Sequence, residues 1–210
     1  MKKIALMGAS GKTGRAFLKL ALASGYEVRA LVRSPQNFDI QHPKLTVIAG
    51  DVLQLSDLSR TLEGCSLVVS LFGQVKNSPH DLQTRGTANI LAAMQQTGIT
   101  QIISLSGGGL PFAADRPKLP DHLIRFIMKL AVPHVLQDAA GHAQLLASSS
   151  FDWMIVRAPR LTLEPARGHY RVGWVGVNAS TSIGRDDLAH FILAQCEKPS
   201  FWGQMPFVSY

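Results

Sequence analysis

Three glycines lie near the start of the 210-residue chain, in the segment Gly8-Ala9-Ser10-Gly11-Lys12-Thr13-Gly14. A short apolar run over residues 4–7 precedes them, and residues 12–24 follow with apolar side chains at helical spacing. A glycine turn between a strand and a helix lets backbone N–H groups approach an anion, and the helix N-terminus adds partial positive charge. The spacing GxxGxxG therefore predicts that this loop holds the pyrophosphate of a dinucleotide; a purely structural turn is the alternative.

A second candidate group follows the strand expected over residues 27–32, where the chain continues Arg33-Ser34. At this place in a dinucleotide site, an acid binds a free ribose 2′-hydroxyl, whereas cations bind a 2′-phosphate. Arg33 brings a guanidinium fork that suits a phosphate, and Ser34 adds another donor. Because no acid ends the strand, the sequence predicts NADP(H) as the cofactor; a solvated arginine is the plainer alternative.

The net charge of +7 is concentrated in the same part of the chain. Residues 1–33 hold seven cations and one anion, whereas residues 34–210 hold fourteen cations and thirteen anions. A basic protein can bind nucleic acid, an anionic membrane surface or a phosphate-bearing small molecule. The position of the charge favours the small molecule, and Phe17 and Tyr26 are too few aromatics for a nucleic-acid face. We expect no nucleic-acid and no membrane partner.

The composition, with 46% apolar and 17% charged residues, is that of a globular protein and excludes a disordered chain or a coiled coil. Cys65 and Cys196 are far apart and predict reduced thiols. The apolar run after Met1-Lys2-Lys3 is too short for a signal peptide, and no run approaches the roughly 18–20 residues that span a bilayer. We expect a cytoplasmic protein. The histidine and cysteine spacings predict no metal site.

Strand-length apolar runs alternate with helical patterns along the chain. We expect strands over residues 4–7, 27–32, 45–49, 67–71, 101–105 and 153–156, and helices over 12–24, 57–62, 82–96 and 186–196, with Ser56 capping the second helix. This alternation predicts an α/β fold, a Rossmann-type doubly wound parallel sheet in a single domain over 1–210. The proline-rich segment 107–133 is less regular and predicts a lid, a contact segment or a plain core helix between loops.

The motifs extend over nearly the full length: the glycine loop, residues 27–35, 50–54, 86–90, 104–106, 156–162 and 183–189. In these motifs the chain resembles the atypical short-chain dehydrogenase/reductase superfamily. The similarity is to its NAD(P)H-binding, NmrA-like branch, and most of all to the biliverdin IXβ reductase or NADPH-dependent flavin reductase type. The resemblance implies a Rossmann fold and NADP(H) as the cofactor.

The resemblance also implies which residues contact that cofactor. The pyrophosphate would be held by Gly8, Ser10, Gly11, Thr13 and Gly14, beside the charge of Lys12, and the 2′-phosphate by Arg33 and Ser34. Asp51 and Val52 would flank the adenine, and Leu71, Phe72 and Gly73 would line the ribose. The nicotinamide would be bordered by Leu105, Ser106, Gly107, Pro159, Arg160 and Leu161. Asp51 could instead cap a turn, and Leu71 and Phe72 could belong to the core.

The positions of the three tyrosines limit the reactions that the protein could catalyse. Short-chain dehydrogenases use Tyr-x-x-x-Lys to move a proton to a carbonyl oxygen. Here Tyr26 is followed four residues later by Ala30 and Tyr170 by Trp174, and Tyr210 is the last residue. Carbonyl reduction is therefore disfavoured. A conjugated acceptor such as a flavin, a quinone or a linear tetrapyrrole-like molecule escapes this difficulty, because water can supply its protons.

Two residues are candidates for direct catalysis. Ser106 could donate a hydrogen bond to the acceptor, and Arg160 could stabilise a developing anion. The flavin-reductase type carries serine where Gly107 falls and histidine where Arg160 falls, so the resemblance does not imply biliverdin as substrate. We expect an NADPH-dependent reductase of a conjugated small molecule, monomeric or weakly dimeric. The alternative is a non-catalytic NADP(H)-sensing or partner-binding NmrA-like protein.

Overall fold

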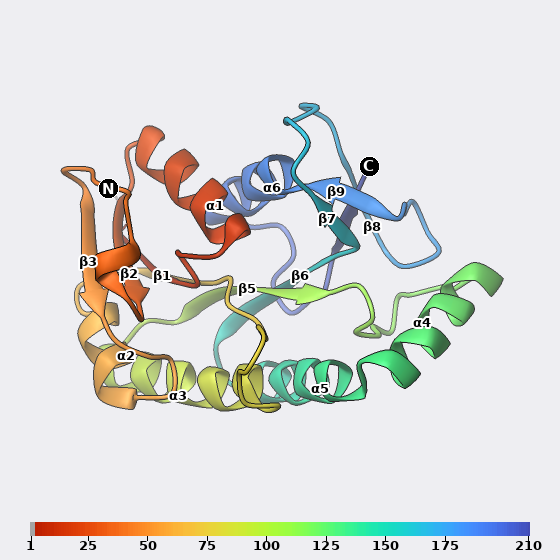
Figure 1. Ribbon diagram of the computed structural model, residues 1–210, viewed down its shortest axis with the longest axis horizontal. Helices are drawn as coiled ribbons and strands as arrows, with labels where there is room; N and C mark the ends of the chain where they lie inside the picture. Colours follow the sequence, from red (N-terminus) through yellow and green to blue (C-terminus); the bar gives the residue numbers. More distant parts are fainter. Residues whose placement is uncertain (1–2) are drawn as a thin grey trace.

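An eight-stranded sheet forms the middle layer of the computed structural model, which describes residues 3–210 (Figure 1). Its strand order is β3-β2-β1-β4-β5-β6-β10-β8, and all neighbours pair in parallel except β10 and β8. The strands are β1 (Lys3–Met7), β2 (Glu27–Val32), β3 (Leu45–Ala49), β4 (Leu67–Ser70), β5 (Gln101–Gly107), β6 (Asp152–Ala158), β8 (Arg171–Gly173) and β10 (Phe207–Ser209). A separate parallel pair joins β7 (Arg160–Thr162) to β9 (Ser182–Gly184).

Helices cover both faces of this sheet (Figure 1). One face carries α1 (Lys12–Ala23) and α6 (Arg185–Glu197), and the other carries α2 (Leu55–Leu62), α3 (Leu82–Thr97) and α5 (Pro133–Ala147). Strand β1 shows why two cores form: Ile4 and Leu6 face the first layer, and Ala5 and Met7 face the second. The predicted doubly wound α/β fold is confirmed.

The structure corrects two details of the sequence prediction. Helix α2 begins at Leu55 with Gln54 as its N-cap, so Ser56 lies inside the helix. The reason is local, because the Asp57 carboxylate in the first turn accepts the N–H of Asp51 and fixes the preceding loop. The sheet is also not wholly parallel, since the three-residue strand β8 pairs antiparallel with β10 at its edge. A strand this short has no period that a sequence pattern could reveal.

The segment expected to be a lid, a contact segment or a core helix contains α4 (Leu119–Ala131). None of its residues is buried, so the core-helix alternative is wrong. In Figure 1, α4 projects from the body beyond the carboxyl end of β5.

A buried ion pair anchors the chain that leads from β5 to α4. Arg157 on β6 is fully buried, and its guanidinium donates to both oxygens of Asp115 at 2.8 and 2.7 Å and to the carbonyl of Leu110 at 2.7 Å. The rings of Phe112 and Phe207 lie within 6 Å of the same guanidinium. Burial acts to raise the pKa of Asp115, but the bonds from Arg157 and from backbone N–H groups outweigh it and lower the pKa.

Asp115→Ala should destabilise the fold by about 3–5 kcal/mol, because it leaves the Arg157 charge buried without a partner. Urea denaturation at neutral pH measures this loss. Asp81→Ala is the matched control, since Asp81 pairs with Arg85 at an exposed site and should lose at most about 1 kcal/mol. Equal losses in the two variants would show that the buried pair has no special role.

A buried histidine links three elements of the second layer. His142 on α5 is 1% exposed, and its ring nitrogens lie 3.3 Å from the Thr87 hydroxyl on α3 and 3.4 Å from the Ser104 hydroxyl on β5. Burial lowers the pKa of His142 to about 4, against the opposing effect of Asp138. The folded protein therefore holds this ring neutral.

The His142 pKa predicts a specific loss of stability in acid. As the pH falls below about 6.5, the unfolded chain takes up a proton that the folded protein refuses until about pH 4. The free energy of unfolding should therefore fall by about 2–3 kcal/mol from this group between pH 7 and roughly pH 4.5. His142→Gln should lack this component in urea titrations, whereas His122→Gln at an exposed position should retain it.

Candidate functional site

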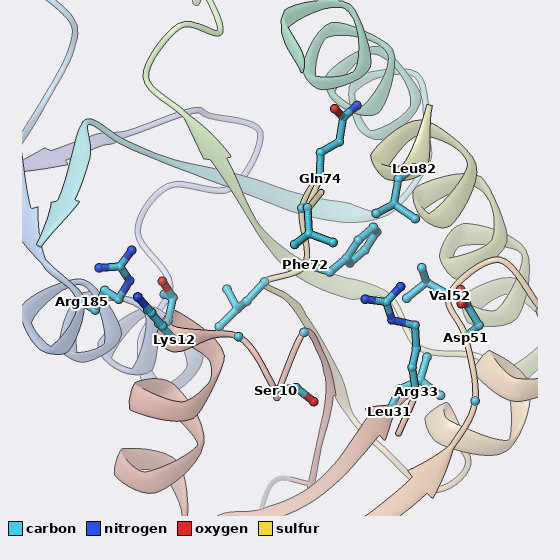
Figure 2. Close-up of a pocket in the computed structure, with 17 residues that line it drawn as sticks. Ser10, Lys12, Leu31, Arg33, Asp51, Val52, Phe72, Gln74, Leu82 and Arg185 are labelled. Atoms are coloured by element: carbon cyan, nitrogen blue, oxygen red, sulfur yellow. The ribbon is translucent and has the colours of Figure 1, made fainter. Parts of the chain in front are cut away.

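A cleft of about 400 Å³ opens where the chain leaves the carboxyl ends of β1, β2, β3 and β4 (Figure 2). In an open α/β sheet, this edge is where ligands bind. The lining residues are Gly8, Ser10, Gly11, Lys12, Thr13, Leu31, Arg33, Gly50, Asp51, Val52, Leu71, Phe72, Gly73, Gln74, Val75, Leu82 and Arg185.

The glycine loop is shaped by close backbone contacts. Gly8 has φ +85°, and a Cβ added there would lie 2.6 Å from the backbone of Leu71 and Phe72. A Cβ at Gly14 would lie 2.0 Å from the Gly8 carbonyl oxygen, and the N–H of Gly11 donates to that same oxygen at 3.0 Å. Larger residues at Gly8 or Gly14 would force the turn away from the sheet.

This turn presents the N-terminus of α1 to the cleft. Gly11 is the N-cap and has no side chain to bond the first-turn N–H groups, and no acid lies in that turn. The side chains of Lys12, Thr13 and Ser10 line the cleft around these groups. Free N–H groups, the helix dipole and a lysine together suit a phosphate or another anion.

The opposite end of the cleft holds Arg33 and Asp51 (Figure 2). Arg33 is exposed and follows β2 directly. One oxygen of Asp51 accepts the N–H of Leu53 at 2.9 Å, so this residue does cap a turn while it also lines the cleft. Asp57 holds the turn by accepting the Asp51 N–H, and this bond, together with Arg60, lowers the pKa of Asp57.

Helix α3 shapes the wall between the two ends. A Cβ at Gly86 would lie 2.6 Å from the Phe72 ring and 3.2 Å from a methyl group of Val52. The side-chain amide of Asn89 donates to the Val52 carbonyl at 3.1 Å. The Gly86-Thr87-Ala88-Asn89 motif therefore has a physical role, because it makes room for one wall residue and fixes another.

A buried carboxylate fixes the loop after β4. Asp138 on α5 accepts the side-chain amide of Gln74 at 2.8 Å and the N–H groups of Gln83 and Thr84 at 2.9 and 2.8 Å. It thereby satisfies two free donors at the start of α3 and ties them to Gln74 in the cleft wall. Sequence reasoning missed Gln74, because its partner lies 64 residues away.

Arg185, the first residue of α6, also lines the cleft and was missed. Its Nη1 donates to the carbonyls of Leu161 and Thr162 at 3.2 and 3.0 Å, and its buried Nε has no hydrogen-bond partner in the described part of the chain. A cation in the first turn of a helix opposes the helix dipole. The position of Arg185 at the start of a predicted helix was therefore the one feature of the sequence that could have marked it as a site residue. The other missed lining residues are Leu31, Gly50, Val75 and Leu82.

Two cations of the basic N-terminal segment, Lys12 and Arg33, line the cleft. Three other cations make ion pairs with acids: Lys3 with Glu27, Arg15 with Asp39, and Arg29 with Glu63. Lys2 lies outside the described residues. With Arg185, the cleft has three cations and the acid Asp51, so its charge favours an anionic ligand.

Several predicted site residues lie outside this lining. Gly14 packs behind the loop, and Ser34 precedes the 3₁₀ turn η1 (Pro35–Asn37). The others lie at the end of β5 or directly after β6: Leu105, Ser106, Gly107, Pro159, Arg160 and Leu161. Ser106 is buried, and its hydroxyl has no hydrogen-bond partner among the described residues. Arg160 is exposed on β7, so the structure does not bring Ser106 and Arg160 into the cleft.

Within residues 3–210, no group of three or more His, Cys, Asp and Glu side chains is placed to hold a metal ion. Over the same residues, no helix combines the length and the apolar character needed to cross a bilayer. Cys65 and Cys196 are not joined in a disulfide.

Comparison with known proteins also indicates a nucleotide-binding protein. A family model described as NAD(P)H-binding matches residues 8–199. Bacillus subtilis (strain 168) protein YwnB is 24% identical, over 94% of this chain and 93% of its own.

Solved structures share the fold. A short-chain dehydrogenase/reductase from Veillonella parvula DSM 2008, in complex with NADP, has a TM-score of 0.82 at 16% identity, covering 100% of this chain and 94% of its own. The anaerobillin reductase ChuY from Escherichia coli O157:H7 has a TM-score of 0.77 at 19% identity, covering 100% and 97%. With its glycine loop and cationic cleft inside the matched region, the chain belongs to the NAD(P)H-binding family.

Proposed function

We propose that this protein is an NADPH-dependent reductase that passes hydride to a conjugated small-molecule acceptor. The observation that carries the proposal is the spacing of charge in the cleft, with Lys12 and Arg185 at one end and Arg33 at the other (Figure 2). NADPH carries phosphate at two places, the pyrophosphate and the 2′-phosphate, and a cleft cationic at both ends suits both groups. The nicotinamide, when bound, would supply the hydride.

The residues present fit this cofactor. The N–H groups at the start of α1 and the side chain of Lys12 would hold the pyrophosphate, and Arg33 with Ser34 would bind the 2′-phosphate. The orphaned hydroxyl of Ser106 lies where β5 ends, next along the sheet edge from the lining after β4. Because this hydroxyl is buried, a ligand that extends from the cleft in that direction would give it a partner only after the Ser106 side chain rotates.

The tyrosines support a conjugated acceptor. None of Tyr26, Tyr170 and Tyr210 lines the cleft, and the Tyr210 hydroxyl donates to Asp187 at 2.7 Å. A planar acceptor stacked on the nicotinamide needs no side-chain acid, because water can protonate the reduced product. A flavin, a quinone or a linear tetrapyrrole meets this condition, and the similar structure of ChuY is described as that of an anaerobillin reductase.

Arg33→Glu should weaken NADPH binding at least roughly tenfold and leave NADH binding within about twofold, since only NADPH carries the 2′-phosphate. Fluorescence titration with each cofactor measures both affinities. Lys19→Glu makes the same charge change at an exposed position of α1 outside the cleft, and it should preserve the preference. Equal weakening of NADPH and NADH by Arg33→Glu would disprove the assignment.

Turnover should be detectable as NADPH oxidation with FMN, a water-soluble quinone or a linear tetrapyrrole. Ser106→Ala should lower kcat by about tenfold to a hundredfold with little change in NADPH affinity, because it removes a donor near the acceptor. Ser59→Ala on the remote helix α2 is the control. Tight NADPH binding without turnover on any acceptor would instead favour the non-catalytic sensor.

A further inference from the structure

Helix α4 turns its apolar side away from the protein. Six large apolar side chains form what we call the outward face, with exposures of 48–86%. These residues are Leu119, Leu123, Ile124, Phe126, Ile127 and Leu130. The half-buried positions of the helix are instead Asp121, Arg125 and Met128, so the polar side faces the body. Soluble helices show the opposite arrangement, and an exposed apolar patch of this kind marks an interaction site.

One bond within α4 caps the helix, and one contact joins it to the loop after β5. The Asp121 carboxylate accepts the backbone N–H of Lys118 at 2.8 Å, which caps the start of the helix. Near its other end, the Met128 side chain lies over Gly109, where an added Cβ would meet its methyl carbon at 3.0 Å. Met128 therefore packs toward the body, on the side of α4 opposite the outward face.

The surroundings of the outward face are basic. Residues 116–135 hold four cations, Arg116, Lys118, Arg125 and Lys129, against one anion, Asp121, a net charge of +3. The rest of residues 34–210 therefore carries a net negative charge, since the whole segment has only fourteen cations and thirteen anions. Arg116, Lys118 and Lys129 are all exposed. An apolar stripe flanked by lysine and arginine is the pattern of a helix that lies at the surface of an anionic membrane.

A second copy of the chain is the rival occupant. The six exposed apolar side chains of the outward face could also pack against the same face of another molecule. A two-fold pair, however, would set the same flank of both helices opposite itself. The flank that carries Lys129 holds no acid, so the same flank of a second copy would offer Lys118 and Lys129 no opposite charge. Anionic lipid phosphates would complement these cations instead.

We propose that the outward face of α4 docks on an anionic membrane surface. The apolar side chains would enter the boundary between headgroups and acyl chains, and Lys118 and Lys129 would reach lipid phosphates. This differs from the expectation of no membrane partner that the sequence supported. If the proposed reductase function holds, docking would bring the segment after Ser106 close to lipid, where apolar quinones dissolve. The docking itself does not depend on that function.

Vesicle flotation of the full-length protein tests the docking. The wild-type protein should float with vesicles of phosphatidylcholine and phosphatidylglycerol, and much less with phosphatidylcholine alone. The double variant Phe126→Ser, Leu130→Ser should reduce the bound fraction at least roughly tenfold. Lys129→Glu should weaken binding at low salt. Leu163→Ser is the matched control, because Leu163 is 70% exposed outside α4, and it should float like the wild type.

Three results would overturn the docking. The first is a wild-type protein that stays unbound, and the second is equal flotation of the double variant. The third is a dimer in analytical ultracentrifugation that the double substitution dissociates while no variant binds vesicles, which identifies a second copy as the occupant. The assay needs neither cofactor nor turnover, so its failure leaves the proposed reductase function standing, and failure of turnover leaves docking intact.

Discussion

The candidate site depends on one close approach, between the turn after β1 and the backbone that follows β4. Gly8 would place a Cβ 2.6 Å from Leu71 and Phe72, and Gly14 would place one 2.0 Å from the Gly8 oxygen. Without side chains at these two positions, α1 can start directly above the sheet edge and aim its N-terminus into the cleft. The shape of the cleft therefore depends on the lack of a side chain at Gly8 and Gly14 as well as on the side chains that line it.

The other walls are fixed by buried polar groups. From α5, Asp138 bonds the start of α3 and Gln74, and from β6, Arg157 bonds Asp115 in the chain that leads to α4. Each group is costly to bury alone and is satisfied by partners from distant elements. Such bonds hold loops in place at the sheet edge, where packing alone would leave them mobile.

Sequence patterns predicted the architecture well and the site in part. The apolar runs located all six expected strands. For the five inner ones the reason is that a buried strand in a parallel sheet needs β-branched and aliphatic side chains on both faces, whereas the edge strand β3 is partly exposed. The glycine loop, Arg33, Asp51 and Phe72 do line one cleft. Gln74 and Leu82 were missed because each enters the cleft through tertiary packing, with no local spacing to reveal it. For Arg185 the one local signal was a cation in the first turn of a helix. Ser56 was wrong as a cap because Asp57 was already bonded to the preceding loop.

By itself, the sequence determined the fold class and the NAD(P)H-binding family, and it predicted that the glycine turn binds phosphate, since these rest on local periodicity and on glycines at set spacing. Only the tertiary structure decided which cations of the basic N-terminal segment face the cleft and which are paired with acids. It alone decided the direction of α4 as well. Periodicity shows that a helix has an apolar side, but packing against the rest of the chain decides whether that side points inward. In α4 it points outward.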